Sequence, residues 1–210
     1  MVGIFNTFVM LFVVIDPIGL APIFAALTFG GSESYRRRMA IRGTMLAALV
    51  LFVFMFVGKP LLHALGIGLP AFRIAGGALL FLLAIDMVFA RQSGLRSTTE
   101  REQEEAGQRK DISVFPLAVP LIAGPGAITT VLLMSGSAGQ TLMGTVAKLL
   151  VLLAVLLLAL GALMLATRIM RFMGETGANT FTRTSGVILA ALAVQFMIDG
   201  LTSIIIPQLK

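Results

Sequence analysis

Two short segments interrupt otherwise apolar stretches with residues that could bind a small charged molecule. The first is Asp16-Pro17-Ile18-Gly19 and the second is Gly124-Pro125-Gly126-Ala127. Proline inside a helix removes one backbone hydrogen bond and clashes with the preceding turn, and glycine lets the backbone leave helical geometry. Aspartate is favoured just before a helix, and proline is favoured as its first residue. Each segment therefore predicts that a new half-helix starts at its proline.

The start of a helix offers free backbone N–H groups and about half a positive charge. Two such starts near the middle of a membrane would suit a small anion, such as the carboxylate of an amino acid. Three roles are open to Asp16: it could cap its own half-helix, attract a substrate ammonium, or take up a coupling proton or cation. Gln195 could bond a zwitterion or a neighbouring helix. The two breaks and Gln195 form the predicted substrate site.

Further polar residues are weaker candidates. Thr129 and Thr130 follow the second break by one turn and are expected either to face the site or to bond their own backbone. Acids near the end of an apolar stretch can be interfacial, and arginines there can anchor helix ends. The candidates for ion coupling or gating, besides Asp16, are Asp86, Asp199, Arg73 and Arg183. Gly76 and Gly77 are expected to allow close helix packing.

The elements that carry these residues must lie in a bilayer. Of the 210 residues, 58% are apolar and 12% are charged, and the mean hydropathy is +0.99. An ordinary soluble domain is about half apolar and a quarter charged, so this class of protein is excluded. A membrane-spanning helix needs about 20 mainly apolar residues, and the chain has six stretches of that kind.

Helices are predicted for these stretches because each helix satisfies its own backbone hydrogen bonds in hydrocarbon. The alternation typical of membrane β-strands is absent. The expected fold is therefore all-α and polytopic, with six transmembrane helices, the first and fourth broken at mid-membrane. The expected spans are Ile4–Phe29, Met39–Val57, Ala71–Ala90, Ile112–Met134, Met143–Ala166 and Thr184–Ile206.

The basic residues predict how the spans are oriented. Twelve of them follow spans one, three and five, whereas four lie on the opposite side: Lys59, Arg73, Lys148 and Lys210. Because basic residues are enriched in cytoplasmic loops, both termini are expected outside and the loop 91–111 in the cytoplasm. Thr99 and Glu102 have the spacing of a capping box, which predicts a short surface helix over residues 100–106.

The loop 91–111 divides the chain into two units of three spans, residues 1–90 and 112–210. Arg73 and Gly76 recur as Arg183 and Gly186, and the mid-span Pro17 recurs as Pro125. Three is an odd number, so the second unit must cross the membrane in the opposite sense. The sequence thus predicts two inverted three-helix repeats, an arrangement of secondary transporters whose substrate site lies at the repeat interface.

Several other classes of site and activity are excluded or disfavoured. The chain has no cysteine and one histidine, so it cannot form a disulfide, a thiolate site or a multi-histidine metal site. The scattered basic residues disfavour nucleic-acid binding. No cofactor is expected beyond a coupling proton or sodium ion, and the oligomeric state is left open. An enzyme is not expected; the enzymatic alternative is an intramembrane aspartyl protease using two of Asp16, Asp86 and Asp199.

Three sequence runs resemble the MarC family of small six-span membrane proteins of bacteria and archaea. They are the residues from Leu11 to Gly19, from Ala123 to Ile128, and from Ala193 to Gly200. The similarity covers essentially the whole chain. The family includes SnatA-type transporters, so the resemblance implies transport of small neutral amino acids such as glycine, alanine or serine. The functional residues that it implies here are those of the two breaks, together with Gln195 and Asp199.

The leading expectation is therefore a secondary transporter for small neutral amino acids in the bacterial plasma (inner) membrane, working by alternating access. Its partners would be membrane lipid and a small zwitterionic substrate. The alternatives are an exporter of another small metabolite or drug, and a membrane accessory protein that transports nothing.

Overall fold

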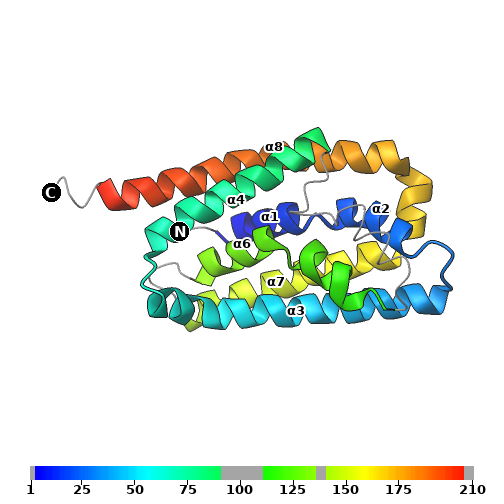
Figure 1. The fold of residues 1–210 in the computed structure, drawn as a ribbon, viewed down its shortest axis with the longest axis horizontal. Coiled ribbons are helices and arrows are strands. Elements are labelled where there is room, and N and C mark those ends of the chain that lie inside the picture. The colour runs from blue at the N-terminus through cyan, green and yellow to red at the C-terminus, as the bar shows by residue number, and fades with distance from the viewer. Residues whose placement is uncertain (1–2, 91–110, 136–140, 206–210) are drawn as a thin grey trace.

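Helices that run lengthwise make up nearly all of the described chain, which comprises residues 3–90, 111–135 and 141–205 of a computed structural model (Figure 1). Within this part, five helices are long and apolar enough to cross a membrane. Two shorter helices, bent by 59° at a break, make a sixth span if they are taken together. The expected all-α polytopic fold is therefore confirmed.

The first and third spans follow the expected boundaries closely, whereas the second is longer at both ends and ends at Ala64 instead of the expected Val57. α3 starts six residues before the expected Met39, because Ser32 caps it by accepting a hydrogen bond from the Tyr35 N–H at 3.2 Å. The arginines Arg37 and Arg38 that follow are exposed, so they do not interrupt the helix. The helices of this half are α1 (Ile4–Ile15), α2 (Pro17–Leu27), α3 (Glu33–Ala64) and α4 (Leu69–Phe89).

The second half differs from the expectation in its first span, where no regular helix precedes the break. Phe115 and Val119 have extended backbone angles, and the peptide bonds to Pro116 and Pro120 are cis. Proline lacks an N–H and disfavours helical geometry in the residue before it, which explains this irregular segment. The elements of this half are η1 (Ser113–Ile122), α6 (Pro125–Ser135), α7 (Leu142–Met164) and α8 (Ala166–Ile205).

The last span starts earlier than the expected Thr184. α8 is broken at Gly174, where φ is 64°, and its membrane-crossing part starts at Thr176. The polar residues of the extra turns indicate a loop in the sequence. In the structure the Oγ1 groups of Thr180 and Thr184 donate to carbonyls four residues earlier, at 2.8 and 3.0 Å. Hydroxyls satisfied in this way need no water, so the helix continues through them.

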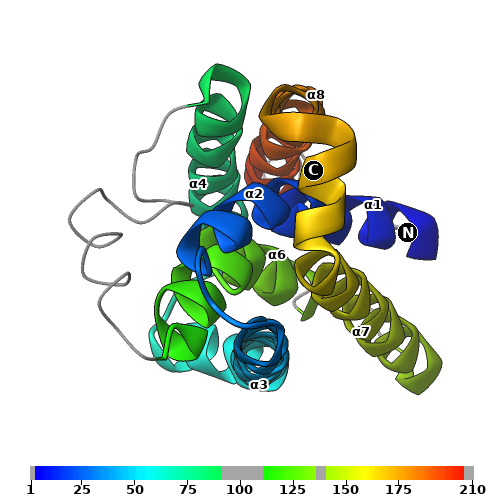
Figure 2. The ribbon, with the colours of Figure 1, turned by 90° about the vertical axis from the view of Figure 1, so that its right-hand side faces the viewer.

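The two broken spans lie in the middle of the molecule. Viewed along its length, α2 and α6 are surrounded by α3, α4, α7 and α8 (Figure 2). In the apolar window of the span Ile4–Leu27, 61% of the residues are buried, against 17% in the span Thr176–Ile205. The residues predicted to bind a substrate are therefore carried by the core, and α8 lies at its edge.

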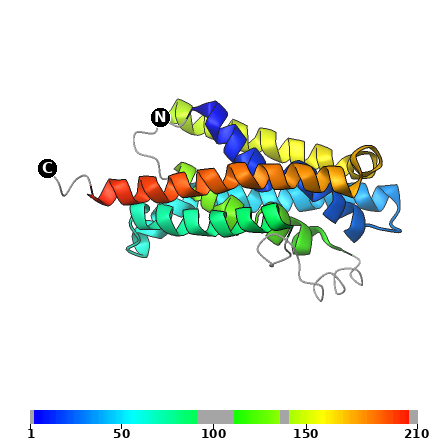
Figure 3. The same cartoon turned by 90° about the horizontal axis from the view of Figure 1, so that it is seen from above.

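α4 and α8 pack against each other as a close antiparallel pair (Figure 3). A Cβ on Gly77 would lie 2.8 Å from the Ala193 carbonyl oxygen, and one on Gly200 would lie 2.9 Å from the Pro70 oxygen. Positions 70 and 77 on α4 face positions 200 and 193 on α8, so each contact lies seven residues from the next. The expected packing role of Gly77 is thus confirmed, and Gly76 packs on α6.

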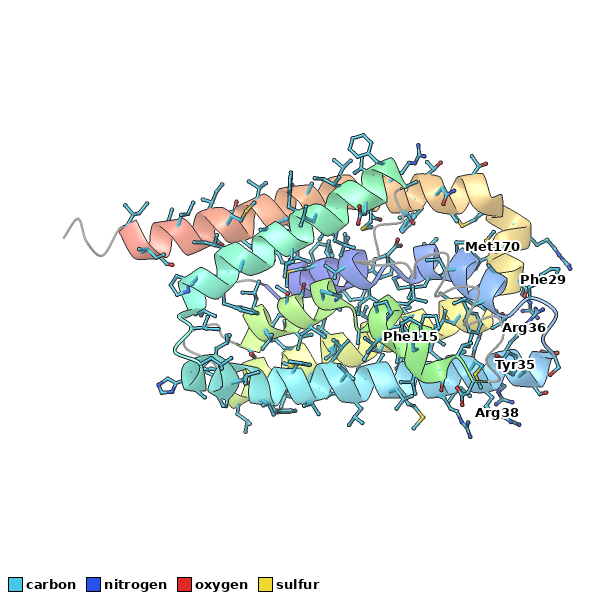
Figure 4. The ribbon with its side chains drawn as sticks, viewed as in Figure 1. Phe29, Tyr35, Arg36, Arg38, Phe115 and Met170 are labelled. Atoms are coloured by element: carbon cyan, nitrogen blue, oxygen red, sulfur yellow. The ribbon has the colours of Figure 1, made fainter. Side chains whose placement is uncertain are left out.

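Both ends of the chain lie at one end of the molecule (Figure 1). The α2–α3 connection and the start of α3 lie at the other end, where Figure 4 shows Phe29, Arg36 and Arg38. Arg36 Nη1 donates to Thr167 Oγ1 of α8 at 3.0 Å there. Which end faces the cytoplasm stays a prediction, as does the division into repeats. The helix expected over residues 100–106 lies outside the described residues.

Candidate functional site

Asp16 joins α1 to α2 and is fully buried. Its backbone is in the left-handed region (φ 45°, ψ 70°), which aspartate tolerates better than most residues, and this turn separates the two helices. Its Oδ1 accepts a hydrogen bond from the Gly19 N–H at 3.0 Å, and Pro17 is the first residue of α2. The half-helix start predicted at Asp16-Pro17 is confirmed, and so is the capping role of the carboxylate.

The second carboxylate oxygen of Asp16 is bound by α8. Thr182 Oγ1 donates a hydrogen bond to Oδ2 at 2.9 Å. Gly19 makes this contact possible, because a Cβ there would overlap both Asp16 Oδ2 and Thr182 Oγ1. Sequence reasoning missed Thr182 because it lies before the expected start of the last span. The signal that could have found it is the row of threonines at 176, 180 and 184, spaced for backbone bonding.

The second break has the same proline but a different residue before it. α6 starts at Pro125, as predicted, and the Ile128 N–H donates to the Gly124 carbonyl at 3.0 Å. Glycine has no side chain, so residue 124 cannot cap α6. The N–H groups of Gly126 and Ala127 lie in the first turn, where an α-helix offers no acceptor of its own. Gly126 and Ala127 are buried, so an anion would reach these donors only from within the bundle.

The two breaks lie next to each other. A Cβ on Gly126 would lie 3.4 Å from Cγ1 of Val14, which precedes Asp16 by two residues. The same Cβ would lie 2.7 Å from Cδ2 of Leu83 in α4. Two half-helix starts from opposite ends of the molecule thus meet near its middle, beside the buried carboxylate.

The two threonines after the second break behave differently. Thr129 packs its methyl group against Gly76 of α4. Thr130 is fully buried, and among the described residues its Oγ1 has no hydrogen-bond partner. Of the two expectations, bonding to its own backbone is therefore excluded for Thr130. Thr44 of α3 is 6% exposed and also has an unpartnered hydroxyl.

Gln195 does not lie with Asp16. Its Nε2 donates to Asp199 Oδ1 at 2.7 Å, one turn along α8, and both residues are exposed. Gln195 is thirteen residues from Thr182, the contact of Asp16 on α8, which is about 20 Å at 1.5 Å per residue. Asp199 is about 25 Å away on the same scale. This hydrogen bond lies within α8, so it is not the bond to a neighbouring helix that the sequence left open as the alternative role of Gln195.

The remaining gating candidates lie at different levels of the bundle. Asp86 follows Ala84, whose carbonyl oxygen would be 3.1 Å from a Cβ on Gly186, so Asp86 lies near the level of Thr182. Arg73 lies beside Gly200, toward the other end of the same helix pair. Arg183 follows Thr182 but is exposed. Asp86 and Arg183 therefore share the level of the first break, and Asp86 is the less exposed of the two.

A second acid, Asp111, caps the start of η1. Its Oδ1 accepts hydrogen bonds from the hydroxyl and the backbone N–H of Ser113, and its Oδ2 lies 3.3 Å from Arg42 Nη1. The Ser113 hydroxyl, then the Ser113 N–H and then the charge of Arg42 lower the pKa of Asp111 below its ordinary value of 3.8. This carboxyl is about half exposed, so its charge is screened by solvent.

The central arrangement can bind both ends of a zwitterion. The carboxylate of Asp16 offers negative charge for an ammonium group, and the first turn of α6 offers N–H donors for a carboxylate. Among the described residues, no group of three or more His, Cys, Asp or Glu side chains lies together as a metal site would require. The chemistry available at the breaks is therefore ionic and hydrogen-bonding recognition.

Comparison with known proteins gives whole-chain matches. The family model described as MarC family integral membrane protein matches residues 1–205. A UPF0056 membrane protein of Archaeoglobus fulgidus is 40% identical, covering 94% of this chain and 91% of its own. A UPF0056 membrane protein of Aquifex aeolicus is 36% identical (95% and 92%), and the Escherichia coli protein YhcE is 30% identical (95% and 92%). No solved structure matches the chain.

Proposed function

The chain belongs to the MarC family of integral membrane proteins, and we propose that it is a secondary transporter of small neutral amino acids. The observation that carries the proposal is that a buried carboxylate, Asp16, lies two residues from Val14, which packs on Gly126 at the start of α6. A carboxylate and free helix-start donors match the two charges of an amino acid.

In this proposal the substrate ammonium binds Asp16 and its carboxylate binds the N–H groups at the start of α6. Asp16 is held by Gly19 and Thr182, so its charge is fixed in place before the substrate arrives. Neighbouring side chains pack closely on Gly19 and Gly126, so both breaks leave little room for the side chain of a substrate. Glycine, alanine and serine are the substrates that this restriction favours.

Alternating access would follow from the two units of three spans. Sites of transporters with inverted repeats lie near the midplane, at broken helices from both repeats. The breaks in the spans of α1–α2 and η1–α6 lie inside the bundle, which supports such a site. A proton or sodium ion would couple transport to a gradient, with Asp16 and Asp86 as its candidate carriers.

The proposed location is the bacterial plasma membrane, with both termini outside. The arginines near the start of α3 and α8 gather at the end opposite the termini, which supports this orientation by the positive-inside rule. Cysteines introduced singly at position 3 and position 31, followed by labelling with a membrane-impermeant maleimide in cells, test it. With both termini outside, we expect labelling at position 3 and none at position 31. The chain has no natural cysteine, so no background labelling interferes.

Reconstitution tests the function directly. Purified protein in proteoliposomes should accumulate labelled glycine, alanine or serine under an imposed proton or sodium gradient, and the matching ionophore should abolish accumulation. Empty liposomes and liposomes containing the Asp16→Asn variant are the controls. Failure to move any of the three amino acids in either gradient would overturn the proposal in favour of another substrate or an accessory role.

A further inference from the structure

We infer that Thr130 belongs to the subsite that binds the substrate carboxylate, together with the N–H groups of Gly126 and Ala127. This inference rests on the proposed function and names a side chain in its binding site. It also restricts the carboxylate to the second break, although the sequence predicts that both half-helix starts could share it.

The first break is poorly suited to an anion. Of its first-turn N–H groups, that of Gly19 is bonded to Asp16 Oδ1 at 3.0 Å and Pro17 has none, which leaves the N–H of Ile18. The negative charge of Asp16 would also repel a carboxylate placed there. The start of α6 carries no acid and no capping side chain, so it is the half-helix start that an anion can approach.

Thr130 lies in the right place to extend this donor set. It follows Gly126 by four residues and therefore lies on the same face of α6. Side chains on a helix lean toward its N-terminus, so the Thr130 side chain leans toward the turn that carries Gly126. That turn adjoins Val14, two residues before Asp16. Leu80 and Leu83 of α4 pack on Gly126 in this structure, so a carboxylate accepts from the backbone and the Thr130 hydroxyl once these flexible side chains move aside.

The hydroxyl of Thr130 needs a partner that the described residues do not supply. It is fully buried and its Oγ1 makes no hydrogen bond there. A buried polar group without a partner destabilises the folded protein, and such groups in native proteins call for an explanation. A substrate carboxylate that accepts from Oγ1 supplies one. Thr44 has a similarly unpartnered hydroxyl but lies in the interior of α3.

The test is transport of alanine in proteoliposomes by Thr130→Val, which keeps the side-chain shape and removes the hydroxyl. We expect the KM for alanine to rise about tenfold, the effect of losing one hydrogen bond to a charged group. The apparent Tm should stay unchanged or rise, because the variant buries no unsatisfied hydroxyl. Thr130→Ser should restore most of the wild-type KM.

Two controls separate the carboxylate subsite from a general effect of the substitution. Thr44→Val removes the other unpartnered hydroxyl and should leave the KM for alanine unchanged. Alaninamide, which has the ammonium group but no carboxylate, should compete with alanine equally well in wild type and in Thr130→Val. Equal loss of alaninamide and alanine binding would contradict the assignment to the carboxylate.

The inference and the proposed function fail in different ways. A wild-type protein that transports no amino acid overturns the proposed function and the inference with it. A wild-type protein that transports alanine, with an unchanged KM in Thr130→Val, overturns the inference alone. Three results together support both: a tenfold rise of the KM for alanine in Thr130→Val, an unchanged KM in Thr44→Val, and a KM restored toward the wild-type value in Thr130→Ser.

Discussion

The half-helix that begins at Pro17 and the one that begins at Pro125 differ in the residue before the proline. Asp16 supplies a carboxylate that caps α2 and also reaches Thr182 of α8. Gly124 supplies no side chain, so α6 starts without a cap. The same backbone device therefore carries negative charge at one break and open N–H donors at the other. In the proposed transporter, this chemical difference would let two similar breaks recognise the opposite ends of one zwitterion.

Removing the charge from the first break should have the largest effect. Asn at position 16 still caps a helix, but it cannot pair with an ammonium group. We expect Asp16→Asn to lower the initial rate of transport about ten- to hundredfold while the protein remains folded. Uptake by proteoliposomes measures this, with Asp199→Asn on the outer face of α8 as the matched control. Transport by Asp16→Asn at the wild-type rate would remove the carboxylate from the mechanism.

A methyl group added at the first break should destabilise the protein more than a methyl group added at the second. In Gly19→Ala the new Cβ overlaps two atoms held by hydrogen bonds, so we expect a loss of about 1–3 kcal/mol, as for overpacked cores. In Gly126→Ala the Cβ meets the ends of flexible leucine side chains, so we expect a loss below about 1 kcal/mol. Thermal unfolding in detergent measures both. Equal losses in the two variants would contradict the tighter geometry of the first break.

The contact between the first break and α8 gives an effect on stability of similar size. Thr182→Val should destabilise the protein by about 1.5–3 kcal/mol, because it removes a hydrogen-bond donor from a buried carboxylate. Thr182→Ser keeps the donor and should lose less than half as much. Apparent Tm values of the two variants make the comparison. If the Thr182→Val and Thr182→Ser variants have equal apparent Tm values, the hydroxyl does not stabilise Asp16.

The smallest effect concerns Asp111, the acid at the start of the second broken span. Because its pKa is lowered in the folded protein, its contribution to stability is present above pH 3.8 and is lost as the pH falls through the folded pKa. Asp111→Asn should therefore be slightly less stable than wild type at pH 7 and equal to it at the lowest pH. Thermal unfolding between pH 7 and pH 3 tests this sign. A difference that grows on acidification would contradict it.

The sequence predicts the spans and both breaks, because proline, glycine and a mid-span acid leave a strong local signal. It does not predict the irregular backbone of η1, although Pro116 and Pro120 lie within it, since two prolines four residues apart are also compatible with a kinked helix. It places Gln195 in the site and omits Thr182. Both errors concern α8, where the face that meets Asp16 depends on packing between distant segments.

The close fit of α4 and α8 limits how the protein can move. Backbone contacts at Gly77 and Gly200 leave no space for one helix to slide along the other, so the two should travel as a rigid body. Gly174, with its φ of 64°, is the point at which the membrane-crossing part of α8 can swing relative to the preceding turns. Because Thr182 lies eight residues beyond this hinge and holds Asp16, a swing of the pair would pull directly on the carboxylate. Opening of the path to the site and release of the substrate ammonium would then be one motion.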